Sequence, residues 1–143
     1  MKADVKRFVI DASVAVAWCF SDESTPFTGG VLRLFAHGAQ AIAPCIWPLE
    51  VANALAVGER RKRITMAQTT VLLDRIVHLA IVVEGSDPAR SFGEIFSIAR
   101  QEHLTLYDAA YAELALRLAL PLATLDDELR RAAQRVGIPL VSV

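Results

Sequence analysis

Short apolar runs alternate with longer amphipathic segments along the chain. The runs are rich in Val, Ile, Leu and Ala, a composition typical of strands that are buried on both faces. Alternation of such runs with helical segments predicts an α/β domain: a three-layer α/β/α sandwich with a mostly parallel central sheet and helices on both faces. The expected strands span residues 8–10, 41–43, 81–83, 122–124 and 140–143.

The segments between these runs carry helix start and stop signals. Thr25, followed by Pro26, predicts the start of a helix that ends before Gly38. Thr65 and Asp87 are the expected N-caps of two further helices, the second of which extends to residue 103. Other helices are expected over 13–20, 48–61, 107–118 and 126–137.

The helix expected over 107–118 has the clearest period. Its apolar residues recur at i, i+3, i+4, i+7, i+8 and i+11, which predicts a single stripe that faces the core. The stripe consists of Tyr107, Ala110, Tyr111, Leu114, Ala115 and Leu118.

Composition narrows the class of protein. With 143 residues, 54% of them hydrophobic, the chain is expected to form one globular domain over residues 1–143 and not a disordered segment. The formal net charge of -1 provides no overall basic field for nucleic acid, so any such binding needs a local patch. No apolar run has the length of a membrane span. Cys19 and Cys45 form no CxxC pair and are expected to be reduced core residues of a cytoplasmic protein.

Four carboxylates stand in unusual places. Asp11 follows a buried strand, and Asp126 follows another. Glu50 and Asp108 lie in apolar surroundings near the starts of predicted helices. Each has an ordinary explanation as a helix cap or as a first-turn acid favoured by the helix dipole. Together, however, they occupy strand ends and helix starts, which converge at one edge of a parallel sheet.

Convergence of four acids has a chemical consequence. Two carboxylates about 4 Å apart repel by roughly 4 kcal/mol at an effective dielectric constant near 20. Such a cluster must take up protons or bind cations. Hard oxygen ligands without His or Cys favour Mg²⁺ or Mn²⁺, and such a site suits the hydrolysis of phosphodiesters. Ser13 and Asn53 are candidates for orienting the carboxylates, with local capping or solvent-facing roles as the alternatives.

In this order, four stretches resemble the PIN-domain nucleases, and within them the VapC-type toxins of bacterial toxin–antitoxin pairs. They read VIDASVAVAWCF, PLEVANAL, LTLYDAAYAELA and LATLDDELRRAA, so the resemblance covers nearly the whole chain. It implies that the acidic positions of the family correspond to Asp11, Glu50, Asp108 and Asp126, with Asp127 as a possible substitute for the last. It also implies Ser13, Asn53 and Thr124 as supporting polar residues.

The same resemblance implies an activity and partners. The expected protein is an Mg²⁺- or Mn²⁺-dependent endoribonuclease and the toxin of a toxin–antitoxin pair. It would act as a homodimer and be silenced by a cognate antitoxin that lays a peptide across the acidic groove. An RNA substrate must also be held, and the candidates are Arg60, Arg61, Lys62 and Arg63. Their alternative role is a favourable interaction with a helix C-terminus.

Two other functions fit parts of the pattern. Receiver domains and haloacid-dehalogenase-like phosphatases also place an Asp after the first strand, but both use a Lys near the phosphate. The lysines of this chain are Lys2, Lys6 and Lys62, and Lys62 lies at a helix end remote from the carboxyl edge of any expected strand. The remaining alternative is a non-catalytic PIN-like module whose acidic groove holds a basic peptide of a partner.

Overall fold

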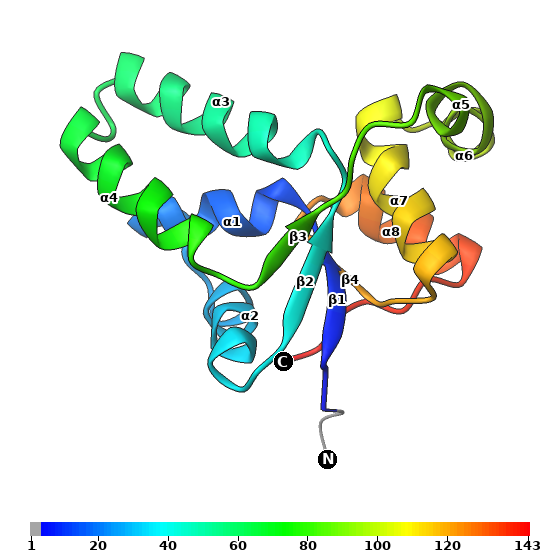
Figure 1. Cartoon of the computed structure of the whole chain (residues 1–143), viewed down its shortest axis with the longest axis horizontal. Helices are drawn as coiled ribbons and strands as arrows, with labels where there is room; N and C mark the ends of the chain where they lie inside the picture. The colour runs from blue at the N-terminus through cyan, green and yellow to red at the C-terminus, as the bar shows by residue number, and fades with distance from the viewer. Residues whose placement is uncertain (1–3) are drawn as a thin grey trace.

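The computed structural model describes residues 4–143 and contains a four-stranded parallel sheet (Figure 1). The strands are β1 (Arg7–Ile10), β2 (Gln40–Ala43), β3 (Ile81–Val83) and β4 (Leu122–Ala123), in the order β3–β2–β1–β4. The three apolar residues of β1 are fully buried between its two neighbours. From β1 the chain first adds β2 and β3 on one side of β1, and it then crosses to add β4 on the other side. The strand order therefore reverses between β1 and β4. Open parallel sheets bind ligands at such a point, beyond the carboxyl ends of the strands.

Helices cover both faces of the sheet, as predicted. On one side lie α1, α2 and α4, and on the other lie α7 and α8, while α3 packs against α1 (Figure 1). The short α5 and α6 lie beyond α7. The bounds are α1 (Ala12–Cys19), α2 (Pro26–Ala36), α3 (Trp47–Arg60), α4 (Met66–Val77), α5 (Pro88–Arg90), α6 (Phe96–Glu102), α7 (Leu106–Leu118) and α8 (Asp127–Val136).

Most predicted helix starts are confirmed at the level of hydrogen bonds. Thr25 and Thr65 each accept a hydrogen bond from the backbone three residues later and form reciprocal capping boxes. Asp87 caps α5 through Ala89 N. Gly38 and Gly137 both have positive φ angles just past a helix end, where glycine has no steric penalty.

Some expectations were wrong. The strand expected over 140–143 is a single bridge between Leu140 and Leu122, made by hydrogen bonds from Leu122 N to Pro139 O and from Val141 N to Leu122 O, both at 2.9 Å. The helix expected from 87 to 103 is interrupted by a π-helical turn (Ser91–Ile95) that contains Gly93. Cys45, expected in the core, is exposed because it lies in the turn between β2 and α3, whereas Cys19 is half-buried.

The predicted stripe of α7 is rotated. Tyr111, Leu114 and Ala115 are buried, but Tyr107 is 61% exposed. The buried face instead includes Ala109 and Ala112, and α7 contacts β1 and β4. Small residues let the backbone of α7 approach the strands closely. The apolar periodicity did not include these two alanines in the predicted buried stripe.

Gly58 marks a close contact between helices. It lies in α3, and a Cβ atom there would be 2.7 Å from Cζ of Phe20 and 3.2 Å from Cγ2 of Ile64. The Phe20 ring has little freedom to move because the guanidinium of Arg63 stacks 4.3 Å from its centroid. Only glycine therefore fits between α3 and the end of α1.

Gly58→Ala is expected to lower the free energy of unfolding by roughly 1–3 kcal/mol, because the added methyl group must displace a packed ring. Urea denaturation measures this loss. Gly93→Ala is the matched control, since a Cβ at that helical position meets nothing within 4 Å. It should be neutral or slightly stabilising, as alanine is favoured in helices. Equal stability of the Gly58 variant and the wild type would contradict this account of the contact.

Candidate functional site

Asp11 lies at the carboxyl end of the central strand and is 5% exposed. Although it stands at the N-cap position of α1, its side chain makes no capping hydrogen bond. Its Oδ2 instead accepts hydrogen bonds from the hydroxyls of Ser13 (2.6 Å) and Thr124 (2.8 Å). Burial raises the pKa of the Asp11 carboxyl above its usual range, and the two hydroxyls oppose that rise. The structure therefore does not support the capping explanation for Asp11.

Thr124 joins the ends of β1 and β4. While its hydroxyl donates to Asp11, its Oγ1 accepts a hydrogen bond from the backbone N–H of Asp126 at 3.0 Å. Ser13 acts in the same way, because its Oγ accepts from Leu125 N at 3.0 Å. The two hydroxyls thus fix the loop after β4 relative to Asp11. Ser13 and Thr124, which the resemblance implied as supporting polar residues, thus both contact Asp11.

Glu50 lies in the first turn of α3 and is held by a residue that the sequence analysis did not select. Its Oε1 accepts a hydrogen bond from the hydroxyl of Tyr111 at 2.7 Å. Burial raises the pKa of Glu50, the Tyr111 contact lowers it, and the nearby Asp11 charge raises it again. Asn53, the predicted support for Glu50, is exposed, and its side chain makes no hydrogen bond within residues 4–143.

Asp108 is the electrostatic centre of the acidic cluster. It lies in the first turn of α7, whose cap is Thr105, so Asp108 itself is not a cap. Burial raises the pKa of Asp108 to about 6, with further contributions from neighbouring carboxylates. These neighbours are Asp126, Asp11, Glu50 and Glu128, in decreasing order of effect.

The structure distinguishes between the two adjacent acids at the start of α8. Asp126 raises the pKa of both Asp11 and Asp108, whereas Asp127 affects neither. Asp126 is also the N-cap of α8, since its Oδ1 accepts from Leu129 N at 2.8 Å. The capping explanation for Asp126 is therefore correct, and it leaves the second carboxylate oxygen free of that contact.

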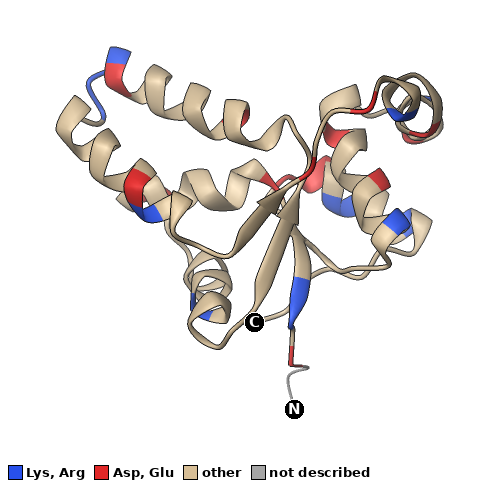
Figure 2. Ribbon diagram, in the orientation of Figure 1, with Lys and Arg blue, Asp and Glu red and all other residues tan. Residues whose placement is uncertain are grey.

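The four predicted carboxylates thus lie at one edge of the sheet, together with Glu128. Figure 2 shows acidic segments gathered where the strands end, between α1, α7 and α8. The spacing places Tyr111 three residues after Asp108 on the same helix face, but it does not reveal the hydrogen bond to Glu50. Glu128 carried no such signal, since acids are common in the first turn of any helix.

The chemistry of this cluster fits a hard divalent cation, because all its charged donors are carboxylates and three of them have raised pKa values. A bound cation would relieve their mutual repulsion. In residues 4–143, as placed, no three His, Cys, Asp or Glu side chains are arranged to hold one ion together. The donors therefore fit by type, while their spacing does not by itself define a coordination shell.

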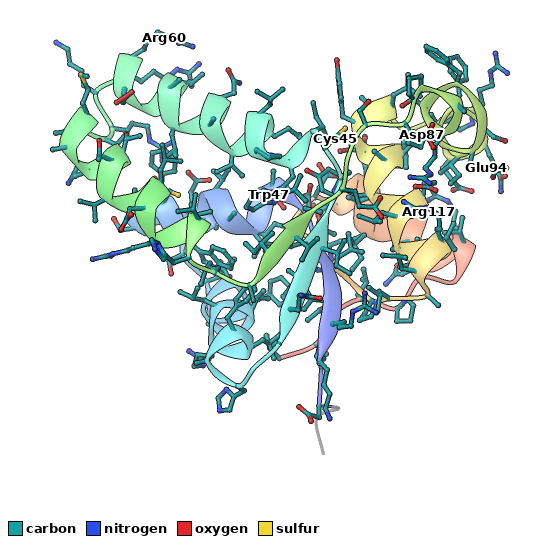
Figure 3. All side chains as sticks on the ribbon, viewed as in Figure 1. Cys45, Trp47, Arg60, Asp87, Glu94 and Arg117 are labelled. Atoms are coloured by element: carbon teal, nitrogen blue, oxygen red, sulfur yellow. The ribbon has the colours of Figure 1, made fainter. Side chains whose placement is uncertain are left out.

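The basic cluster 60–63 lies far from these acids. Glu50 is in the first turn of α3, whereas Arg60 ends the helix, about 15 Å further along at 1.5 Å per residue. Figure 3 shows Arg60 at the end of α3 remote from Cys45, which precedes the helix. Arg63 also pairs with Asp22 and Glu23 at 3.1 and 3.0 Å. Its guanidinium thus links two parts of the fold, and RNA contact by this cluster stays a prediction.

Comparisons with known proteins agree with this geometry. A family model for the PIN domain matches residues 8–135, so the chain belongs to the PIN domain family, generally a metal-dependent nuclease fold. The crystal structure of PAE2754 from Pyrobaculum aerophilum is similar, with a TM-score of 0.68 and 24% sequence identity over 92% of this chain and 87% of that chain. This likeness concerns the fold. No curated protein gives a significant match. Within residues 4–143, no helix is long and apolar enough to cross a membrane.

Proposed function

We propose that this protein is an Mg²⁺- or Mn²⁺-dependent endoribonuclease and the toxin of a toxin–antitoxin pair. The observation that carries the proposal is the cluster of Asp11, Glu50, Asp108 and Asp126 at the β1/β4 edge, in a PIN domain. When bound, the cation would polarise a phosphodiester and lower the pKa of an attacking water. The protein contributes the carboxylates and their fixed orientation.

The side chains have distinct roles in this proposal. Asp11 is the most rigid carboxylate, because two hydroxyls hold one oxygen and leave Oδ1 free of them. Asp108, half-buried among four other acids, gains most from a cation. Tyr111 orients Glu50 through its hydroxyl. Such contacts behind the ligands commonly change activity 10–100-fold when they are removed.

The partners are part of the same proposal. A basic peptide of an antitoxin would bind across the acidic edge, where its charge complements the cluster. A homodimer is supported by exposed apolar side chains and by a cavity between the turn before α3 and α7. Tyr107, which lines the cavity, is 61% exposed, and Leu49 and Phe92 are 68% and 80% exposed. Burial of such side chains against a second copy would be favourable.

The direct test is a cleavage assay with purified protein and end-labelled single-stranded RNA. Cleavage is expected with millimolar Mg²⁺ or Mn²⁺ and should stop when EDTA removes the metal, because the carboxylates alone cannot stabilise charge on a phosphate. A DNA strand of the same sequence serves as the control for substrate class. Co-purification with a small protein encoded by the adjacent gene would support the toxin role.

One outcome would favour another function. If neither metal supports cleavage, and a basic peptide still binds with an affinity that falls in salt, the acidic edge serves as a non-catalytic binding groove. This alternative is favoured by one observation: within residues 4–143, no three acidic, His or Cys side chains are arranged to hold one ion.

A further inference from the structure

A polar cavity of about 320 Å³ opens beside the acidic cluster. One wall is the turn between α6 and α7, from Gln101 to Leu104, and the other is a face of α8. His103 is exposed at this turn and has a left-handed backbone conformation, with φ of 56°. The cavity plays no part in the proposed cluster of ligands.

Charge changes sign along this cavity. Glu128, Arg131 and Arg135 line it from α8, at spacings of three and four residues on one helix face. Glu128 lies at the end near Asp108, whose pKa it raises, while the two arginines lie progressively further from the acids. At 1.5 Å per residue, Arg131 is about 7.5 Å along the helix axis from Asp126.

The two arginines differ in whether their guanidinium groups are already paired with a carboxylate. Arg135 donates Nε to the nearly buried Glu102 at 2.7 Å, which fixes the side chain and leaves its two terminal nitrogens without partners in residues 4–143. Arg131 is exposed and forms no ion pair with any residue of that range. Arg130, by contrast, is committed to the fold through the carbonyl oxygen of Thr124.

We infer that this cavity binds a phosphate group of the RNA strand, next to the one held at the acidic cluster. Arg131 supplies the main contact, and Arg135 and His103 flank it. Both walls of the cavity continue directly into the acidic cluster: α7, with Asp108, follows the turn, and the start of α8 carries Asp126. A strand that leaves the acids through this opening therefore meets cationic donors. The inference rests on the proposed ribonuclease function and deepens it.

The chemistry of the cavity selects this ligand. Guanidinium groups bind phosphate oxygens through paired N–H donors, and Arg135 is already oriented by Glu102. Phosphate contacts position a strand without reading its sequence. The cavity should therefore set the register of RNA at the acids and not the choice of base.

The test compares binding of a labelled ten-nucleotide single-stranded RNA to wild type, Arg131→Gln and Arg131→Lys, in EDTA so that nothing is cleaved, over a range of KCl concentrations. Arg131→Gln should weaken binding about 3–10-fold and make the slope of log K against log salt shallower by about 0.7, the value for one phosphate of a single strand. Arg131→Lys should keep the wild-type slope. Arg33→Gln, the same charge change on α2, is the control and should match the wild type.

In the cleavage assay, Arg131→Gln should raise KM and leave kcat unchanged, because the lost contact is made equally before and during the reaction.

The outcomes separate the two proposals. If wild type cleaves RNA and Arg131→Gln keeps the wild-type affinity and slope, the phosphate site is wrong and the ribonuclease function stands. If wild type binds RNA with the expected loss in Arg131→Gln but never cleaves it, the phosphate site stands and the catalytic proposal fails. If the wild type cleaves RNA with Mg²⁺ but binds none in EDTA, the phosphate site is wrong; if it neither binds nor cleaves RNA, both proposals fail.

Discussion

Replacing Asp11 with asparagine is expected to lower the rate of RNA cleavage by at least about 100-fold while the fold stays intact. The amide cannot supply the negative charge that a cation needs, but its carbonyl oxygen still accepts from Ser13 and Thr124, which both bond to Oδ2 in the wild type. Because Asp11 is 5% exposed, the substitution also removes a charge whose burial is unfavourable. Stability should therefore be unchanged or higher.

Cleavage rates and thermal unfolding measure these two effects separately. Asp74→Asn, on the exposed surface of α4, is the control and should cleave at the wild-type rate. Asp11→Ala provides a contrast, because it leaves two hydroxyls without an acceptor at a cost of about 1–3 kcal/mol each at most. An Asp11→Asn protein with wild-type activity would show that Asp11 is not a ligand.

The second large effect is a coupling of stability to pH and metal. The pKa of Asp108 is raised to about 6 in the folded protein, above its ordinary value of 3.8. Between those pH values the native state binds more protons than the unfolded state does. The stabilisation that results is complete below pH 4 and is lost as the pH rises through about 6. The raised pKa values of Asp11 and Glu50 act in the same direction.

In EDTA, the melting temperature of wild type is therefore expected to fall relative to that of Asp108→Asn between about pH 4 and pH 6.5. Subtracting the melting temperature of one protein from that of the other removes the contributions of other titrating groups. One of these is Glu84, whose pKa is lowered by Arg117. Millimolar Mg²⁺ should raise the melting temperature of wild type more at pH 7.5 than at pH 5, since the cation competes with protons for the same carboxylates. A Mg²⁺ shift that is equal at both pH values, or absent, would count against a metal site formed by Asp108.

The fold was largely predictable because its strands are short, apolar and separated by capped helices. β1 to β3 coincide with predicted runs to within one residue, and the caps at Thr25 and Thr65 form as expected. The two elements that were predicted wrongly depend on local features that the pattern of apolar residues does not reveal. The expected fifth strand is reduced to one bridge at Leu140, and a π-helical turn around Gly93 divides the helix after Asp87.

The candidate site was predictable to the extent that topology determines it. Carboxylates at strand ends and helix starts must share an edge in a parallel sheet, so Asp11 and Asp108 could be brought together from the sequence alone. The hydrogen bond between Tyr111 and Glu50 could not, because it depends on the rotation of α7 against α3. That same rotation exposes Tyr107, which the periodicity had assigned to the core.

The hydrogen bond from Thr124 to Asp11 has a consequence for protein synthesis. It spans 113 positions of the chain, and the loop it fixes carries Asp126. Domains begin to fold while the ribosome is still extending them, N-terminal parts first. A growing chain that has reached Asp108 thus has three of its acids but neither the hydroxyl that orders Asp11 nor the fourth carboxylate. Assembly of the complete acidic edge is therefore delayed until nearly the whole domain has emerged. If the proposed ribonuclease function holds, this order of assembly keeps the acidic edge incomplete while the chain is still beside the RNA that encodes it.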